Sequence, residues 1–399
     1  MTLPSDSGSA ASNAMVMVAA GELFAGAERQ ILALLVRLRA DGYQPTLAVF
    51  HDRELARRAR ECGVDVVVLP GSGALQTAAV DSIAGLVRAR NARIVHFHGY
   101  KAALHVALAR KKIAFESVVT LHGAPEFAGP LSARLRSLIY DWSQRFAIRV
   151  TRARIVFVTR QLARKLASMA GGRPFAVIPN GIDPQTVANL TRPAELNPAQ
   201  FNVVVVGRLD AVKGIPFAIE ALRDPRLPAT VRLCIVGDGP ERDRLRELAA
   251  TSGLGQRVSF TGFRADAAAF IAHADLLLMP SLHEGLPYTM LEAIASATPL
   301  AASRVGGMAE NLEHGRTGLL FPVGDVSAVA AAIAAVASDP ALGERIGHCA
   351  QSELLPRFEA ALMARGYEEI YAQLGEVTVS RPVSTDSVLN GSRSPASTK

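Results

Sequence analysis

Short apolar runs of strand length alternate with helical patterns along almost the whole chain. The first series of runs lies at residues 15–20, 46–50, 64–69, 93–97, 117–121, 155–158 and 175–178, and the second at 202–206, 232–236, 258–260, 276–279, 299–302 and 318–321. Such alternation is typical of parallel sheets whose crossover connections are helices. It predicts two doubly wound α/β domains facing across a cleft, with ligands at the carboxyl ends of the strands.

A change in composition marks the division between the two domains. The run from Pro179 to Pro184 contains a turn-forming Asn-Gly pair, and the residues from there to 200 show little apolar periodicity. We therefore predict a first domain over 14–185, a linker over 186–200 and a second domain over 201–355. A final helix over 356–374 carries apolar residues that suit a return to the first domain. We expect a flexible N-terminus over 1–13 and a disordered tail over 375–399, since neither has the apolar content for a core.

Bulk composition narrows the class of protein. With 49% hydrophobic and 20% charged residues, 399 residues suffice for two ordinary domains. Cys62, Cys234 and Cys349 are far apart and odd in number, so neither a disulfide framework nor a zinc site is indicated. Residues 1–13 lack the basic residues of a signal peptide, and the Ala-rich run 326–337 is too short to span a bilayer. We expect a cytoplasmic protein.

The run from Pro280 to Ala293 is the most informative segment for function. Glu284 and Glu292 stand eight positions apart, after a buried strand at 276–279 and across a predicted turn into a helix over 288–297. Pro287 suits the first helical position. Backbone N–H groups of residues 285–288 would then point out of the helix and favour an anion such as a diphosphate. Alone, this carboxylate spacing is weak evidence, because such pairs usually face solvent.

A second loop of the predicted second domain carries positive charge. Gly207 ends a strand, and Arg208 and Lys213 follow it at the mouth of the next helix. A guanidinium fork, an ammonium charge and helix N–H groups are what a pyrophosphate requires. The alternative is a solvated turn. Because the same carboxyl edge carries Glu284, we favour a binding role.

Two further loops of this domain are less specific. The run from Val236 to Arg242 has Arg242 where a dinucleotide fingerprint needs its third glycine, so we interpret it as a structural turn. Gly262 and Phe263 follow the next strand. They would place a flat side chain or main-chain donors beside a base, or form an ordinary loop with a partly buried Phe.

The first domain offers a glycine loop and several histidines. Gly26 lies at a helix entrance, where a small residue lets a ligand approach the backbone closely or simply serves the turn. His122 follows the strand at 117–121 and is a candidate partner for a sugar hydroxyl or a proton, although a lone histidine is more often structural. We place His96 and His98 on alternating faces of their strand and therefore expect no shared metal.

These residues together resemble the retaining glycosyltransferases of the GT-B fold, in particular the large group classed as family 4 (glycosyltransferase group 1). The resemblance runs from residue 15 to residue 373. Its most specific parts are residues 177–183, Gly207-Arg208 with Lys213-Gly214, Glu284-Gly285 with Glu292-Ala293, and Gly306-Gly307 with Glu310. It implies two Rossmann-like domains, the N-terminal one binding mainly the acceptor and the C-terminal one a nucleotide-diphosphate sugar.

The resemblance also implies roles for individual residues. Arg208 and Lys213 match the diphosphate-binding pair, Glu292 the carboxylate on the ribose hydroxyls, and Glu284 the one that faces the donor sugar. Amides after Glu284 would cap the phosphate, and His122 matches the cleft histidine. The expected catalytic residues are His122, Arg208, Lys213 and Glu284; the expected donor-binding residues are Gly26, Gly207, Arg208, Lys213, Gly262, Phe263, Glu284, Gly285, Leu286, Pro287 and Glu292.

The glycine loop departs from the family pattern. Many relatives have two adjacent glycines, whereas this chain reads Ala25-Gly26-Ala27-Glu28. If Ala25 cannot adopt the backbone angles of a glycine, the geometry of this loop must differ.

The resemblance leads to a hypothesis about the reaction. We expect front-face transfer of a hexose with retained anomeric configuration, without a covalent glycosyl-enzyme, a cofactor or an obligatory metal. Arg208, Lys213 and the helix N-terminus would stabilise the charge that grows on the departing diphosphate. The expected acceptor is a glycan or a lipid-linked molecule of cell-surface polysaccharide or glycolipid synthesis. Two alternatives stay open: a sugar-nucleotide epimerase, and a noncatalytic protein that binds sugar nucleotides or polysaccharide.

The net charge of +7 leaves the macromolecular partners open. Basic and apolar residues interleave in segments 101–113 and 131–165, the second of which contains Arg134, Arg136, Arg145, Arg149, Arg152 and Arg154. This surface would suit binding to anionic lipid at the inner face of the cytoplasmic membrane. The alternative is a solvated helix face on which the aliphatic parts of the Arg side chains cover apolar surface. Nucleic acid is not expected, because no recognised binding module is present. The donor sugar and base, the acceptor and the oligomeric state are not indicated.

Overall fold

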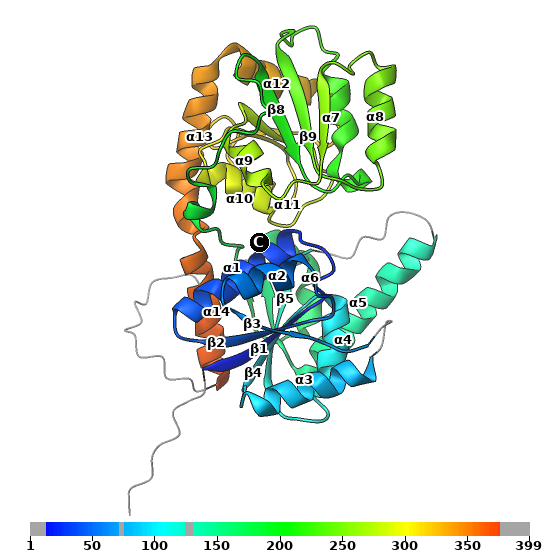
Figure 1. Ribbon diagram of the computed structural model, residues 1–399, viewed down its shortest axis with the longest axis vertical. Helices are drawn as coiled ribbons and strands as arrows, with labels where there is room; N and C mark the ends of the chain where they lie inside the picture. The colour runs from blue at the N-terminus through cyan, green and yellow to red at the C-terminus, as the bar shows by residue number, and fades with distance from the viewer. Residues whose placement is uncertain (1–12, 72–75, 124–130, 376–399) are drawn as a thin grey trace, which may run out of the picture. The chain divides into compact units, whose positions relative to one another are not determined.

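The computed structural model describes residues 13–71, 76–123 and 131–375, with only the backbone over 131–137 (Figure 1). The predicted flexible N-terminus and disordered tail lie outside the described residues, apart from residues 13 and 375. The chain divides into two compact units. The first unit combines Met1–Ile178 with Met363–Lys399, and the second is Pro179–Leu362.

The described residues of the first unit form a seven-stranded parallel sheet in the order β3-β2-β1-β4-β5-β6-β7. All six residues of β1 are buried, as expected for a central strand covered on both faces. The strands are β1 (Ala14–Ala19), β2 (Gln44–Val49), β3 (Asp65–Val68), β4 (Ile94–His98), β5 (Glu116–Leu121), β6 (Arg154–Phe157) and β7 (Phe175–Val177).

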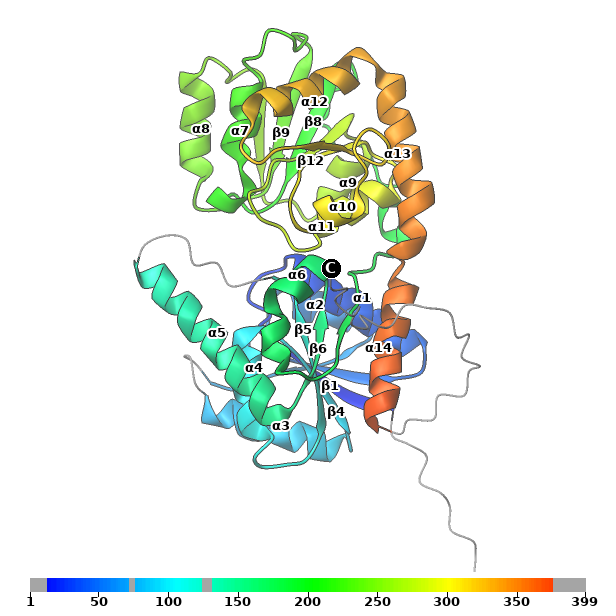
Figure 2. The same ribbon diagram turned by 180° about the vertical axis from the view of Figure 1, so that it is seen from behind.

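Helices cover both faces of this sheet (Figures 1 and 2). Side chains of α1, α2 and α14 share one hydrophobic core with residues from one face of the strands. The helices are α1 (Gly26–Ala40), α2 (Glu54–Glu61), α3 (Thr77–Ala89), α4 (Gly99–Ala109), α5 (Leu131–Thr151), α6 (Arg160–Leu166) and α14 (Ala360–Gly375), and the 3₁₀ turn is η1 (Ala167–Ala170).

The last helix, α14, completes the core of the first unit. Tyr367 and Tyr371 are fully buried. The Tyr367 hydroxyl lies 2.8 Å from Thr120 Oγ1, and Gln30 Nε2 donates to it over 3.1 Å. The Tyr371 hydroxyl lies 2.8 Å from His96 Nδ1. A helix far along the sequence thus satisfies buried polar groups on α1, β4 and β5.

The described residues of the second unit form a six-stranded parallel sheet in the order β10-β9-β8-β11-β12-β13. The strands are β8 (Phe201–Val206), β9 (Val231–Val236), β10 (Val258–Gly262), β11 (Leu276–Met279), β12 (Leu300–Ser303) and β13 (Leu319–Phe321). The helices are α7 (Ile215–Ala221), α8 (Arg242–Thr251), α9 (Ala267–Ala272), α10 (Tyr288–Ala295), α11 (Gly306–Asn311), α12 (Val326–Ser338) and α13 (Pro340–Leu354), with 3₁₀ turns η2 (Pro184–Val187), η3 (Ala211–Lys213) and η4 (Leu355–Arg357).

Every predicted strand is present among the described residues, with ends shifted by two residues or fewer. The prediction of two Rossmann-like domains is confirmed, since both sheets are parallel and strand order reverses beside β1 and beside β8.

The division of the chain falls earlier than the sequence indicated. Residues 179–185, which we assigned to the first domain, lie in the second unit because their contacts are there. Asn180 Nδ2 donates to the Leu286 carbonyl over 2.7 Å, and the Tyr288 hydroxyl donates to the Gly181 carbonyl over 2.9 Å. Nor is 186–200 a free linker, because Leu196 is buried in the second unit.

In the part of the chain that the structure describes, no single helix is long and apolar enough to cross a bilayer. The helices Val326–Ser338 and Pro340–Arg357, bent by 102° relative to each other, meet that criterion only as a pair.

Candidate functional site

Two loops meet at the carboxyl edge of the second unit's sheet. One follows β8 and carries Arg208 and Lys213; the other follows β11 and carries Glu284. Because β8 and β11 are neighbours in the sheet, the loops lie together. Lys213 Nζ donates to Glu284 Oε1 over 2.6 Å, and the carboxylate side chain is only 9% exposed. The structure thus brings together two residues that the sequence assigned to one site.

A serine and the backbone reinforce this pairing. Ser281 Oγ donates to the same Glu284 oxygen over 2.8 Å, so one carboxylate oxygen accepts from both a hydroxyl and an ammonium group. Leu282 N donates to the Val212 carbonyl over 2.8 Å and joins the two loops. Sequence reasoning gave Ser281 no role, although it stands in the run that contains Glu284.

Arg208 adds a second positive charge at this edge. Its side chain is 57% exposed, and its Nε lies 3.9 Å from a carboxylate oxygen of Asp210. Burial raises the pKa of Asp210, while the charges of Lys213 and Arg208 oppose this shift. Asp210, which the sequence analysis did not assign to the site, therefore belongs to the same charged group. The exposed guanidinium is available to a ligand.

Close backbone packing holds the Glu284 loop in place. Gly306 has a φ of +51°, and a Cβ there would collide with the Glu284 carbonyl oxygen. Gly307 N donates to the Gly285 carbonyl over 2.6 Å. Gly214, with a φ of +61°, leaves no room for a Cβ beside the Pro280 carbonyl oxygen. Only glycine fits at Gly306 and Gly214, which explains why the motifs carry glycine there.

The helix after this loop differs in detail from expectation. Pro287 is the N-cap residue of α10, with φ −74° and ψ 137°, so the prediction that it is the first helical residue was wrong. Proline also lacks an N–H, so it cannot cap a phosphate by donation. The helix ends at Ala295, because Ala297 has a φ of +55°. Glu292 lies on α10 and is 6% exposed, so it is not one of a solvent-facing pair.

The loop after β9 is packed against neighbouring backbone, whereas the loop after β10 exposes an aromatic side chain. Gly237 has a φ of +140°, and a Cβ there would collide with the Gly207 carbonyl oxygen. Gly237 N donates to the Gly262 carbonyl over 2.8 Å, which supports the interpretation of this run as a structural turn. Phe263 is 66% exposed rather than partly buried. Its ring is therefore free to stack on a flat ligand group.

In the first unit, the glycine loop needs no second glycine. Ala25 has φ −125° and ψ −159°, an extended conformation open to any residue, and α1 begins at Gly26. A Cβ on Gly26 would meet nothing within 4 Å, so the approach to this backbone is open. Gly21 is the constrained residue, with a φ of +69°. The departure from the family pattern therefore causes no backbone strain at Ala25.

His122 is part of a histidine cluster that the sequence analysis missed. His122 Nε2 lies 3.1 Å from His98 Nδ1, and the rings of His96 and His98 lie 4.3 Å apart. The placement of His96 and His98 on alternating faces was wrong, because residues two apart on a strand share a face. Burial lowers the pKa of His96 to about 3 and that of His122 to about 4, and it lowers the pKa of His98 well below its usual value.

Among the described residues, no group of three or more His, Cys, Asp or Glu side chains has an arrangement that could hold a metal ion.

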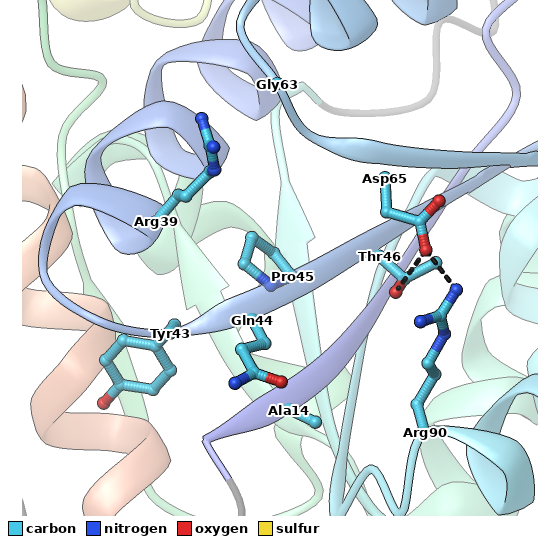
Figure 3. A pocket seen from close by; sticks show the side chains of 9 residues that line it. All are labelled: Ala14, Arg39, Tyr43, Gln44, Pro45, Thr46, Gly63, Asp65 and Arg90. Atoms are coloured by element: carbon cyan, nitrogen blue, oxygen red, sulfur yellow. Dashed lines mark hydrogen bonds and ion pairs between the residues drawn. The ribbon is translucent and has the colours of Figure 1, made fainter.

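A pocket of about 220 Å³ lies at the amino-terminal ends of strands in the first unit's sheet (Figure 3). Ala14, Gln44 and Asp65 line it, and they are the first residues of β1, β2 and β3. Asp65 pairs there with Arg90 and accepts from Thr46 Oγ1 over 3.5 Å. Ligands of doubly wound sheets bind at the carboxyl ends of strands, so this pocket is not the predicted site.

Models of two protein families match the chain. The family described as Glycosyl transferases group 1 matches residues 200–339, and Glycosyltransferase Family 4 matches residues 24–186.

Curated relatives carry glycosyltransferase names. The chain is 32% identical over 219 residues to the lipopolysaccharide core biosynthesis glycosyltransferase LpsE of Rhizobium meliloti. This match covers 55% of this chain and 64% of LpsE. It is 30% identical over 266 residues to the 2-deoxystreptamine glucosyltransferase of Streptomyces kanamyceticus. This second match covers 62% of this chain and 68% of the glucosyltransferase. The match thus spans less than two thirds of the length of LpsE.

Solved structures share the fold. HepE of Anabaena, in complex with UDP and glucose, aligns with a TM-score of 0.77 at 23% identity and covers 90% of this chain and 99% of HepE. Sucrose-phosphate synthase of Thermosynechococcus elongatus aligns with a TM-score of 0.78 at 19% identity and covers 92% of this chain and 100% of the synthase.

Proposed function

We propose that this chain, which belongs to the group 1 glycosyltransferases of family 4, transfers a sugar from a nucleoside diphosphate sugar to a glycan or a lipid-linked acceptor. The observation that carries the proposal is the ion pair between Lys213 and Glu284 at the carboxyl edge of the second unit's sheet, with Arg208 on the same loop as Lys213. An ammonium, a guanidinium and a carboxylate in that position match a diphosphate with a sugar attached to it.

The pairing of Lys213 with Glu284 suggests how the donor enters. Phosphate oxygens compete with Glu284 for the Lys213 ammonium group, and Arg208 offers a second, exposed cation. Glu284 keeps the hydrogen bond from Ser281, and its other oxygen is then available to accept from a hydroxyl of the donor sugar. The ion pair therefore prearranges two side chains that make different contacts once a donor binds.

The same residues suit the chemistry of transfer. When the bond between the sugar and the phosphate breaks, negative charge grows on the leaving diphosphate, and cations held in advance stabilise it. We assign this role to Arg208 and Lys213. We assign Glu292 to the ribose hydroxyls and His122 to a sugar hydroxyl. Transfer proceeds on one face of the sugar with retained configuration and without an obligatory metal.

The relatives support a particular range of substrates. HepE was solved with UDP and with UDP-glucose, and the Rhizobium relatives are named for lipopolysaccharide core biosynthesis. We therefore place UDP sugars first among donors and a cell-surface glycan or glycolipid precursor first among acceptors.

The test is a transfer assay with UDP, GDP and ADP sugars, preceded by thermal-shift screening to identify the nucleotide that stabilises the protein. Lys213→Ala should lower kcat on the order of a hundredfold, because one donor to the developing charge is lost. Lys165→Ala, at an exposed lysine of α6, is the matched control and should retain the parent rate.

Three outcomes would contradict the proposal. An unchanged rate for Lys213→Ala would remove Lys213 from the site. An isomerised nucleotide sugar formed without acceptor would indicate an epimerase. Loss of turnover in EDTA with rescue by a divalent metal would show that the reaction needs a metal ion. NMR analysis of the product's anomeric configuration tests retention separately.

A further inference from the structure

Helix α5 exposes large apolar side chains along one face. Leu138, Ile139 and Trp142 are 55%, 53% and 63% exposed. Their spacing places Leu138 and Trp142 one helical turn apart, with Ile139 beside them. Figures 1 and 2 show the N-terminal part of α5 extending beyond the other helices of the first unit. A cluster of exposed large apolar side chains on one helix commonly marks an interaction surface.

Stacking holds both α5 and its exposed tryptophan in place. Tyr140, on the side of α5 away from Leu138 and Trp142, stacks on Tyr100 at the start of α4 with ring centroids 3.6 Å apart. Trp142 stacks on Phe146 with centroids 5.5 Å apart. Stacked rings lose little conformational entropy on binding, so the surface is partly organised in advance.

Positive charge continues the same face. Arg145 and Arg149 are exposed and follow Trp142 at intervals of three and four residues, and exposed Arg152 comes directly after the last residue of α5. The sequence of α5 contains a single acidic residue, Asp141, which pairs with Arg145 over 2.7 Å. The exposed apolar side chains are therefore followed along the helix by exposed arginines. Arg134 and Arg136 belong to the same helix, but their side chains lie outside the description.

We propose that this face of α5 docks on an anionic lipid surface. Leu138, Ile139 and Trp142 enter the boundary between headgroups and acyl chains, while Arg149 lies at the anionic headgroups. Tryptophan suits that boundary, since its ring is apolar and its N–H is polar.

Charge complementarity favours lipid over a second copy of this chain. Two copies of α5 together hold two acidic residues against eight arginines, so pairing them would bring like charges together. An anionic bilayer supplies the missing negative charge. The proposal goes beyond glycosyl transfer, because docking requires neither a donor nor an acceptor.

Trp142 makes a direct experiment possible, because it is the only tryptophan in the sequence. The full chain is titrated with phosphatidylcholine vesicles, with and without phosphatidylglycerol, while tryptophan emission and cosedimentation are recorded. We expect the vesicles with phosphatidylglycerol, but not those of phosphatidylcholine only, to shift the tryptophan emission to shorter wavelength and to bring the protein into the pellet. Raised salt should weaken both effects.

Variants locate the surface. Ile139→Asp should abolish the emission shift, and Arg149→Gln should weaken partitioning about fivefold, because each basic residue near an anionic membrane favours binding by that factor. Val323→Asp replaces another exposed apolar residue, in the second unit, and should bind as the parent does.

Equal emission shifts with neutral and anionic vesicles, or parent-like partitioning of Ile139→Asp, would overturn the proposal. The proposal would also be overturned if the parent protein formed a dimer in the absence of lipid and the Ile139→Asp variant were a monomer. Stabilisation by nucleoside diphosphates is measured on the same variants. If Ile139→Asp keeps that stabilisation, its fold and donor site are intact, and failure of docking is distinguished from failure of the proposed transferase activity.

Discussion

At the scale of single residues, Glu284 shows how the protein pairs a largely buried carboxylate with donors from two loops. Its side chain is 9% exposed, and Lys213 and Ser281 both donate to Oε1. A charge removed from water is costly unless it is paired and hydrogen-bonded, so each partner is needed. Hydrogen bonds of 2.6 and 2.8 Å to one oxygen restrain the Glu284 side chain.

The histidine cluster predicts how stability depends on pH. The folded pKa values of His96 and His122, about 3 and about 4, lie below the ordinary value of 6.5, and burial lowers that of His98 as well. Below pH 6.5 the unfolded chain therefore binds more protons than the folded chain. The free energy of unfolding should fall as pH drops from 6.5 toward 4, by up to about 1.4 kcal/mol per pH unit for each histidine.

Urea unfolding of the first unit, followed at several pH values between 7.5 and 5, measures this dependence. His96→Gln should reduce the slope, because one titrating group is removed, even if it lowers stability at pH 7.5. A free energy that does not change between pH 6.5 and 5 would show that the histidines are protonated in the folded protein.

At the scale of elements, the loops after β8 and β9 fit together through glycine. Gly237 has a φ of +140°, and the space for its Cβ is taken by the Gly207 carbonyl oxygen. Gly207 directly precedes Arg208, so packing between two loops sets the position of a predicted site residue. This contact involves backbone atoms, which cannot move aside as a flexible side chain can.

Gly237→Ala should therefore destabilise the second unit by roughly 3 kcal/mol, through backbone strain and displacement of the β8 loop. Weaker binding of a nucleoside diphosphate should accompany this loss, since Arg208 moves with the loop. Chemical denaturation and nucleotide titration measure the two effects. Gly255→Ala is the control, because a Cβ there meets nothing within 4 Å and the variant should be nearly neutral. Equal stability of the two variants would contradict the argument.

At the scale of the whole molecule, the chain leaves the first unit, builds the second and returns to the first through α14. The return is held by buried tyrosines, with the Tyr371 hydroxyl 2.8 Å from His96 and the Tyr367 hydroxyl 2.8 Å from Thr120. The first unit is therefore complete only after the second has been synthesised.

Tyr367→Ala should lower the stability of the first unit by roughly 3 to 5 kcal/mol, because a large buried side chain is removed. The second unit should unfold as in the parent, since Tyr367 belongs to the other core. Hydrogen exchange followed peptide by peptide separates the two units. Gln373→Ala, at an exposed position on the same helix, is the control. Faster exchange of both units in Tyr367→Ala would contradict the assignment of α14 to the first core.

The sequence by itself determined the succession of strands and helices and the chemical character of two loops. Burial of a strand such as Leu276–Met279 depends on a short apolar run that can be read locally. Arg208, Lys213, Glu284 and Glu292 could likewise be proposed from residue type and from their place after strands. Their roles toward a donor stay predictions.

Only the tertiary structure decided which residues meet. Lys213 and Glu284 are 71 positions apart and touch because β11 lies beside β8 rather than beside β10. The same holds for His122 with His98, for Tyr371 with His96, and for Asn180 with the Leu286 carbonyl. These contacts depend on strand order and on long-range packing. Local sequence patterns contain neither, since periodicity reports which face of an element is buried and not which element covers it.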